Sequence, residues 1–145
     1  MHRNAHSKKL INKCSSKLTM VNKRLLHAQE IETFYAIPTI RRYLAEFMLE
    51  QGKKQKEIAE LFGTTTATIS QYTSKKRGNE ITFGPEVIKE LKEASKRIKD
   101  MHTYMFETQK ILKFLRTTEI ICKIHKRFGG VPSDCNADAM GCNKA

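Results

Sequence analysis

The sequence predicts an all-α fold, and three observations support this prediction. Apolar residues recur at three- and four-residue spacing along most of the chain, which is the period of a helix with one buried face. Glycine and proline stand where these patterns end or begin, as they do at helix boundaries. No stretch alternates apolar and polar residues with the two-residue period of a half-buried strand.

The charge balance indicates a polyanionic partner. The chain carries 27 Lys and Arg against 15 Asp and Glu, a formal net charge of +12. Residues 1–30 contribute +6, from seven basic residues and one acidic, and residues 53–77 contribute +4, from six and two. Such an excess favours nucleic acid as the partner first and an anionic membrane surface second.

The sequence contains neither a membrane span nor a secretory signal. No apolar run approaches the roughly 20 residues that cross a bilayer, and no uninterrupted apolar segment follows the first basic residues. We therefore predict a cytoplasmic protein without membrane association, with Met20 as an alternative start of the natural chain. Its four cysteines are expected to be free thiols or metal ligands rather than disulfides.

The predicted helices begin after a basic arm. Residues 1–19 are polar and aperiodic and are expected to be flexible, whereas the mixed apolar pattern of residues 21–35 favours a helix. Pro38 suits the first position of the next helix, and Gly52 ends it. The apolar stripe of that helix consists of Ile40, Tyr43, Leu44, Phe47 and Met48.

Two short helices are predicted next. A helix over residues 54–62 is closed by Gly63, which tolerates the left-handed conformation that a helix end requires. Residues 64–66 offer hydroxyl groups as N-caps for a second helix, which is expected to end at Gly78. Ala59 is small where the two helices cross, and Ile69 fixes the second helix onto the first. The spacing therefore predicts a helix-turn-helix.

The stretch QKEIAELFGTTTATISQYTSKKRG resembles the helix-turn-helix of the lambda-repressor-like (XRE-type) regulators. The residues that carry the resemblance are Gln55, Ala59, Gly63, and Ile69 with Ser70, followed by a basic segment. The preceding IPTIRRYLAEFMLEQG is similar to the supporting first helix of small archaeal regulators, and so is a C-terminal helix followed by scattered Cys and His. The resemblance covers residues 36–142 and is strongest over residues 38–78.

The resemblance implies that the second helix enters the major groove of double-stranded DNA with its N-terminal residues at base edges. Threonine and glutamine suit base edges, whereas Lys and Arg suit phosphates. Ser70 is expected to face the phosphate backbone or to cap locally. The expected DNA-binding residues are Gln55, Thr65, Thr66, Ala67, Thr68, Ser70, Gln71, Lys75, Lys76 and Arg77.

A heptad pattern after Pro85 predicts self-association. The apolar residues of this pattern alternate four and three apart, as in a coiled-coil seam: Val87, Leu91, Ala94, Ile98, Met101 and Met105. We expect the seam to form a homodimer that reads a palindromic operator. The alternative is that it packs onto the chain's own helix that begins at Pro38. A helix over all of residues 86–126 would be long, so a break is expected near Asp100–Thr103.

Cysteine and histidine residues near the C-terminus predict a metal centre. Three thiols and one imidazole complete a tetrahedral zinc set, and thiolates also hold iron–sulfur clusters; the residues are Cys122, His125, Cys135 and Cys142. Such a centre would make DNA binding responsive to metal or redox state. The alternative is that Cys122 is a buried core thiol and the other two are free.

Four segments are therefore predicted: a flexible basic arm (1–19), a helix-turn-helix DNA-binding domain (20–80), a helical dimerisation segment (85–128) and a Cys-containing tail (129–145). The expected function is that of a sequence-specific transcriptional regulator. The chain has no phosphate-cradling glycine loop and no nucleophile–base pairing, so neither enzymatic activity nor a small-molecule substrate is expected. The alternative function is an antitoxin or adaptor-type module that uses the same fold to bind a protein.

Overall fold

A computed structural model describes residues 24–142, and over this range the all-α prediction is confirmed, because helices and loops are present and no strand is. The basic arm predicted over residues 1–19 lies outside the described residues. In chain order the elements are α2 (Ala28–Ile31), the π-helical segment η1 (Glu32–Ala36), α3 (Ile37–Glu50), α4 (Gln55–Phe62), α5 (Thr66–Thr73), α6 (Pro85–Arg97), α7 (Met101–Thr117), α8 (Ile120–Phe128) and α9 (Ala137–Met140).

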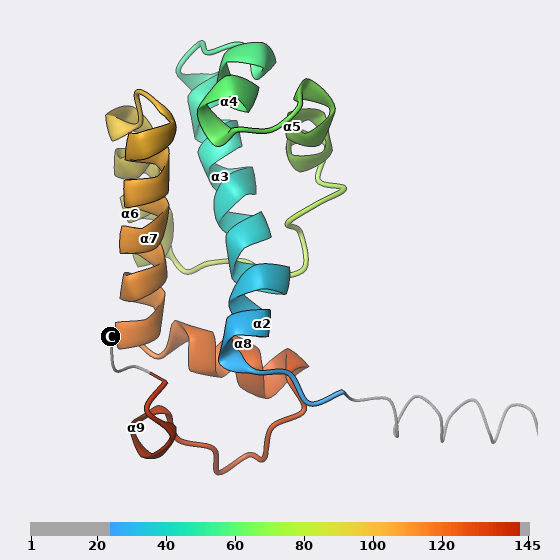
Figure 1. Cartoon of the computed structure of the whole chain (residues 1–145), viewed down its shortest axis with the longest axis vertical. Helices are drawn as coiled ribbons and strands as arrows, with labels where there is room; N and C mark the ends of the chain where they lie inside the picture. The colour runs from blue at the N-terminus through green and yellow to red at the C-terminus, as the bar shows by residue number, and fades with distance from the viewer. Residues whose placement is uncertain (1–23, 143–145) are drawn as a thin grey trace, which may run out of the picture.

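The segments α2, η1 and α3 form one helical rod that contains Pro38 (Figure 1). A proline inside a helix removes a donor, and its ring crowds the carbonyl group four residues back. The wider π turn accommodates this, because the N–H of Ile37 donates to the carbonyl of Glu32, five residues back. The predicted helix after Pro38 is thus confirmed as α3, but the rod already begins at Ala28.

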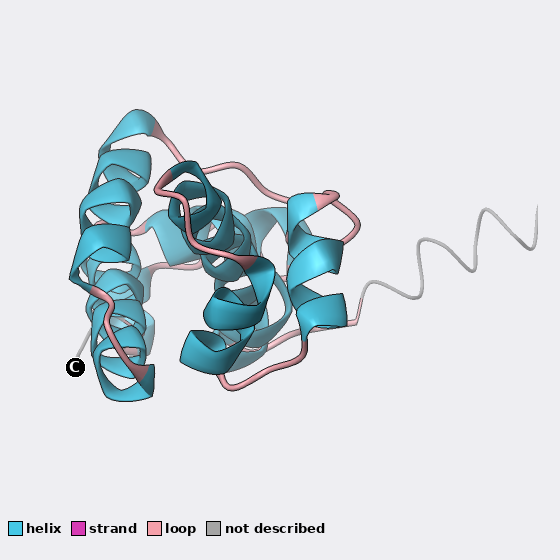
Figure 2. Cartoon of the chain, turned by 90° about the horizontal axis from the view of Figure 1, so that it is seen from above, coloured by secondary structure: helices cyan, strands magenta, loops and turns pink. Residues whose placement is uncertain are grey.

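Helix α3 lies at the centre of the fold. Figure 1 shows it between α5 on one side and the α6–α7 pair on the other, with α4 at its upper end and α8 below. Figure 2 shows the same helices from above. The core runs through all of them, and its largest fully buried side chains are Tyr72, Ile31, Ile40, Leu44, Met48, Ile58, Ile69, Leu91, Ile98, Ile111, Leu112 and Leu115.

The heptad seam is buried within the chain. Val87, Leu91, Ala94 and Ile98 are at most 1% exposed, because α6 packs along α3. The alternative interpretation of the stripe is therefore the one confirmed: it packs onto the chain's own helix. These four residues are not available to a second copy unless α6 leaves the core.

The predicted break in the long C-terminal helix is confirmed. Helix α6 ends at Arg97, and Asp100 caps α7 by accepting a hydrogen bond from the N–H of Thr103 at 2.7 Å. Because of this break the last two residues of the heptad pattern leave the core: Met101 is 60% exposed and Met105 is 56% exposed.

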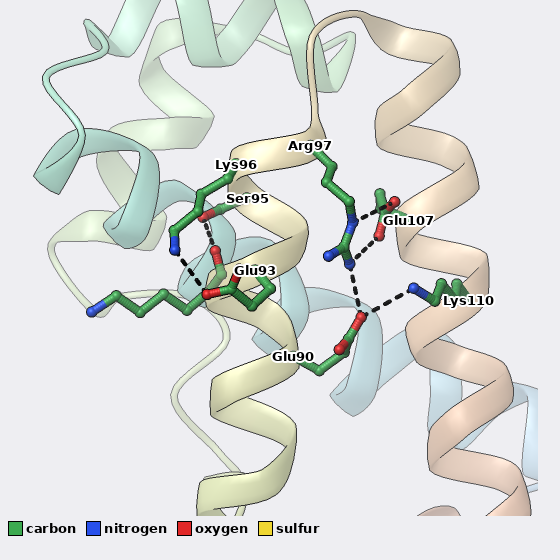
Figure 3. Close-up of polar contacts among 8 residues, drawn as sticks. Glu90, Glu93, Ser95, Lys96, Arg97, Glu107 and Lys110 are labelled. Atoms are coloured by element: carbon green, nitrogen blue, oxygen red, sulfur yellow. Dashed lines mark hydrogen bonds and ion pairs between the residues drawn. The ribbon is translucent and has the colours of Figure 1, made fainter.

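Ion pairs fix α6 against α7. Arg97 donates to both carboxylate oxygens of Glu107, at 2.9 and 2.8 Å, and also to Glu90 at 2.8 Å (Figure 3). Lys110 on α7 reaches the same oxygen of Glu90 at 3.3 Å. Two helices are thereby joined by a chain of four charges, in addition to the contacts of their apolar faces.

A membrane-spanning helix is not found within residues 24–142, because each helix there is too short or too polar to cross a bilayer.

Candidate nucleic-acid interface

Helices α4 and α5 form a two-helix unit joined by a tight turn. Gly63 closes α4 in the left-handed conformation, with φ 61° and ψ 40°, which glycine adopts without steric cost. The N–H of Thr64 then donates to the carbonyl of Ala59 at 2.9 Å. Ala59 is buried where α4 meets α5, and Ile69 is fully buried. The local expectations for Ala59, Gly63 and Ile69 are confirmed.

A threonine cap begins α5. The hydroxyl oxygen of Thr65 accepts a hydrogen bond from the N–H of Thr68 at 3.2 Å, and the two hydroxyl oxygens lie 3.0 Å apart. This cap satisfies one of the N–H groups that a helix start leaves without a partner. The start of α5 is therefore fixed by residues that also face outward.

The predicted base-contacting residues share an exposed face of α5. Thr65, Thr66, Ala67, Ser70 and Gln71 are exposed, Thr68 is half-buried, and Ile69 and Tyr72 on the other side are buried in the core. Gln55, at the start of α4, is half-buried. A ligand can therefore reach the hydroxyl and amide groups of α5 while the core holds the helix rigidly from behind.

The basic residues after α5 lie on a loop and not, as predicted, on the last turn of the helix. Helix α5 ends at Thr73, five residues before Gly78. Lys75 takes the left-handed conformation with φ 58°, and the N–H groups of Lys76 and Arg77 both donate to the carbonyl of Gln71, at 3.0 and 3.1 Å. The three exposed cations are thus folded back beside the end of α5.

The basic loop is also fastened to α3. Gly78 has φ 69° and packs so closely that a Cβ atom added to it would lie 2.3 Å from the carbonyl oxygen of Pro38. Nε of Arg42 donates to the carbonyl of Gly78 at 2.7 Å, and the same guanidinium bonds Glu46 at 3.2 Å. The loop from Lys75 to Gly78 is therefore held at both ends.

Arg41 was not among the residues predicted from the sequence. Its Nε donates to the phenol oxygen of Tyr104 at 3.0 Å. Burial opposes its charge, but the phenols of Tyr104 and Tyr72 outweigh burial and raise the pKa of Arg41. The sequence did contain a sign that Arg41 needs a partner from elsewhere. On its own helix, the positions three and four residues away carry no acidic residue that could pair with it: Ile37, Pro38, Leu44 and Ala45.

The predicted metal ligands do not form a metal site within residues 24–142, where no group of three or more His, Cys, Asp or Glu side chains is placed to hold an ion. Nε2 of the buried His125 lies 2.6 Å from the carbonyl oxygen of Leu26, so one ring nitrogen is already engaged. Cys122, Cys135 and Cys142 are free thiols and half-buried. The arrangement does not fit a tetrahedral centre as it stands, and the zinc or iron–sulfur centre stays a prediction.

The three thiols nevertheless lie near one another. Burial raises the pKa of Cys122, and Cys142 and Cys135 raise it further by their proximity. Cys135, Cys142 and His125 also line a cavity of about 640 Å³ between α2, α8 and the C-terminal segment. A raised pKa keeps the thiol of Cys122 protonated at neutral pH and therefore a poor nucleophile.

Comparison of the chain with protein-family models, with curated proteins and with solved structures finds no match in any of the three. The likeness to lambda-repressor-like regulators therefore depends on the residues of this chain alone.

Proposed function

We propose that this chain is a sequence-specific DNA-binding transcriptional regulator, in which α4 and α5 form a helix-turn-helix of the lambda-repressor-like type. One observation supports the proposal most: the exposed hydroxyl and amide groups of α5 adjoin the exposed basic loop of Lys75, Lys76 and Arg77. Groups that suit base edges and groups that suit phosphates are thereby presented side by side on a buried support.

The dimensions of α5 suit the major groove. An α-helix with its side chains is about 10–12 Å across, and the major groove is about 12 Å wide, so it admits such a helix. When the start of α5 lies at the base edges, Thr66 contacts a base through its hydroxyl and methyl groups. Gln71 forms two hydrogen bonds with an adenine, through the oxygen and the nitrogen of its side-chain amide. Lys75, Lys76 and Arg77 then contact phosphates, which add affinity and fix the register of the helix without reading sequence.

We further propose that the regulator acts as a homodimer on a palindromic operator, through a surface on α7 that includes only the last two, exposed residues of the heptad pattern. Met101 and Met105, four residues apart on one face of α7, are 60% and 56% exposed, and the adjacent Phe106 is 62% exposed. Large apolar side chains grouped in this way mark interaction surfaces more often than isolated ones do.

Charge complementarity favours a second copy as the occupant of this surface. Around Met101, at the start of α7, three acidic residues (Glu57, Glu60 and Asp100) outnumber two basic ones (Lys53 and Lys99), and the exposed Lys110 and Lys113 lie further along the helix. Two copies of α7 packed antiparallel about a twofold axis would set the acidic start of each against the basic part of the other. A twofold interface requires such a self-complementary surface.

Selection of bound sequences from a random duplex pool tests the function. A homodimeric regulator is expected to enrich a palindromic motif whose half-sites lie about one helical turn apart. Binding to the enriched duplex should also weaken steeply with salt. A pool that stays random after repeated rounds would contradict sequence reading and would favour the antitoxin or adaptor alternative, for which DNA binding is secondary.

A further inference from the structure

A pocket of about 360 Å³ lies where η1 and the start of α3 face the end of α5 and the basic loop. This volume lies within the range of ligand pockets in proteins. Its charged lining residues are three cations, Arg41, Lys76 and Arg77, and one acid, Glu80. The pocket therefore carries a net charge of +2, from three positive charges and one negative.

Arg41 is the unusual member of this lining. Three arginines in the described part of the chain are not exposed, and two of them bind a carboxylate: Arg42 bonds Glu46 at 3.2 Å, and Arg116 bonds Glu32 at 2.6 and 2.7 Å. For Arg41 no ion pair is found among these residues, and its polar partners are the phenols of Tyr104 and Tyr72. The phenols offset the cost of burial but bring no negative charge, so the guanidinium can still take an anionic ligand as a further partner.

The mouth of the pocket is held in place. The N–H groups of Lys76 and Arg77 are both bonded to the carbonyl of Gln71, and Gly78 is bonded to Arg42. The two exposed cationic side chains therefore start from a fixed backbone beside the guanidinium of Arg41. A site whose groups are fixed before binding loses less entropy when a ligand arrives.

The geometry points to a phosphate group as the ligand. We propose that the pocket binds phosphate, with Arg41 as its inner ligand and with Lys76 and Arg77 closing over it. A phosphate offers up to two negative charges to a site of charge +2, and its oxygens accept from the planar guanidinium fork in pairs.

The phosphate group bound in this pocket could come from either of two sources. One is a backbone phosphate of DNA bound on α5, in which case the inference deepens the proposed function and rests on it. The other is a free phosphorylated molecule, whose apolar part would meet Phe34, which is 51% exposed beside the pocket. The experiment below separates the two.

The test compares the wild type with Arg41→Gln, with a Lys76→Gln, Arg77→Gln double variant, and with Lys89→Gln, which removes an exposed charge on α6 away from the pocket. Calorimetry measures the affinity for inorganic phosphate and for pyrophosphate without DNA. We expect measurable binding by the wild type, a loss of about tenfold or more in both pocket variants, and no change in Lys89→Gln. Circular dichroism checks that each variant is folded, and the double variant, which changes exposed side chains only, keeps the test decisive if Arg41→Gln unfolds.

Competition with DNA identifies the source. If a DNA phosphate occupies the pocket, pyrophosphate displaces duplex, and Arg41→Gln lowers the slope of log affinity against log salt by about 1. If a free ligand occupies it, pyrophosphate binds without displacing duplex, and this result also supports the pocket. Should the pocket variants bind pyrophosphate as well as the wild type does and keep its salt slope, the phosphate site is overturned. Failure of DNA binding alone would remove the proposed function and leave the phosphate result intact.

Discussion

The ring of Phe62 stacks on the ring of Tyr104, with centroids 4.4 Å apart and planes inclined by 15°. Phe62 is the last residue of α4, and Tyr104 lies in the first turn of α7. The phenol oxygen of Tyr104 also accepts the hydrogen bond from Arg41 on α3. One buried tyrosine therefore fixes the α4–α5 unit against two other helices, and the orientation of α5 depends on it.

Two substitutions at Tyr104 separate these roles. Tyr104→Phe keeps the stack and removes the hydrogen bond with Arg41, so we expect a loss of about 1 kcal/mol in the free energy of unfolding. Tyr104→Ala removes the ring as well and should cost about 3–5 kcal/mol. Urea denaturation followed by circular dichroism measures both. Equal losses would mean that the stack with Phe62 contributes nothing.

A pair of glycine substitutions tests the close approach of the basic loop to α3. Gly78 and Gly52 both have positive φ, at 69° and 87°, so alanine is strained at either position. A Cβ on Gly52 meets nothing within 4 Å, whereas one on Gly78 meets the carbonyl of Pro38 at 2.3 Å. We expect Gly52→Ala to cost about 1–2 kcal/mol and Gly78→Ala distinctly more. Thermal unfolding measures the difference, and equal losses would show that the loop moves freely away from Pro38.

Protonation of Glu107 should lower the free energy of unfolding at acidic pH. Hydrogen bonds from Arg97 lower the pKa of this buried carboxyl, against the opposing effect of burial. A carboxyl whose pKa is lowered by folding adds stability above its unfolded pKa, here 4.5, and loses it as the pH falls through the lower folded value.

Glu107→Gln should therefore flatten the decline in stability below about pH 4.5. At neutral pH it should cost about 1–2 kcal/mol, a figure reduced for the partial exposure of Arg97. The comparison variant is Glu93→Gln, which breaks the exposed pair with Lys96 (Figure 3); Lys96 also lowers the pKa of Glu93, but solvent screens this pair, so the acid limb of the stability curve should change much less. Unfolding curves from pH 7 to pH 3 measure both variants; an unchanged acid decline in Glu107→Gln would contradict the assignment.

Locally determined features of the α4–α5 unit were predictable from the sequence. Gly63 is required by the left-handed turn, Thr65 by the helix start, and Ala59 by the helix crossing, and each of these requirements acts within ten residues of chain. The end of α5 was mispredicted at Gly78, because no apolar residue after Tyr72 continues the buried face. Because no packing would stabilise another helical turn, the carbonyl of Gln71 instead accepts hydrogen bonds from the N–H groups of Lys76 and Arg77 in the loop.

Features that depend on distant segments were not predictable. The heptad pattern predicts correctly that Leu91 is buried. It does not predict against what, because an apolar stripe that faces a second copy and one that faces α3 have the same spacing. Similarly, Arg41 visibly lacks an acidic neighbour on its own helix, yet its partner Tyr104 stands 63 residues further along the chain. The continuous helical rod around Pro38 also depends on packing, because a helix in an isolated peptide would be expected to end or kink at this proline.

Self-association should depend on the exposed side of α7. Met105→Lys places a charge on the proposed twofold interface, where each substitution acts twice, so the dimer should weaken by about tenfold or more. Met140→Lys is the matched control, because Met140 is 67% exposed on α9 and away from that surface. Sedimentation equilibrium over a range of concentrations measures both. A wild type that stays monomeric, or equal effects of the two substitutions, would contradict this interface.

Gln71 and Lys76 should affect DNA binding in different ways, although they lie five positions apart and are both exposed. Gln71→Ala removes a base contact, so affinity for the selected duplex should fall by about 1–3 kcal/mol while affinity for random duplex stays nearly constant. Lys76→Ala removes a phosphate contact, so both duplexes should bind more weakly by a similar factor and the salt slope should decrease by about 1. Fluorescence anisotropy with the two duplexes at several salt concentrations measures all four affinities. If the two variants lose affinity in the same proportion on both duplexes, α5 does not read bases, and the exposed face of that helix serves another partner.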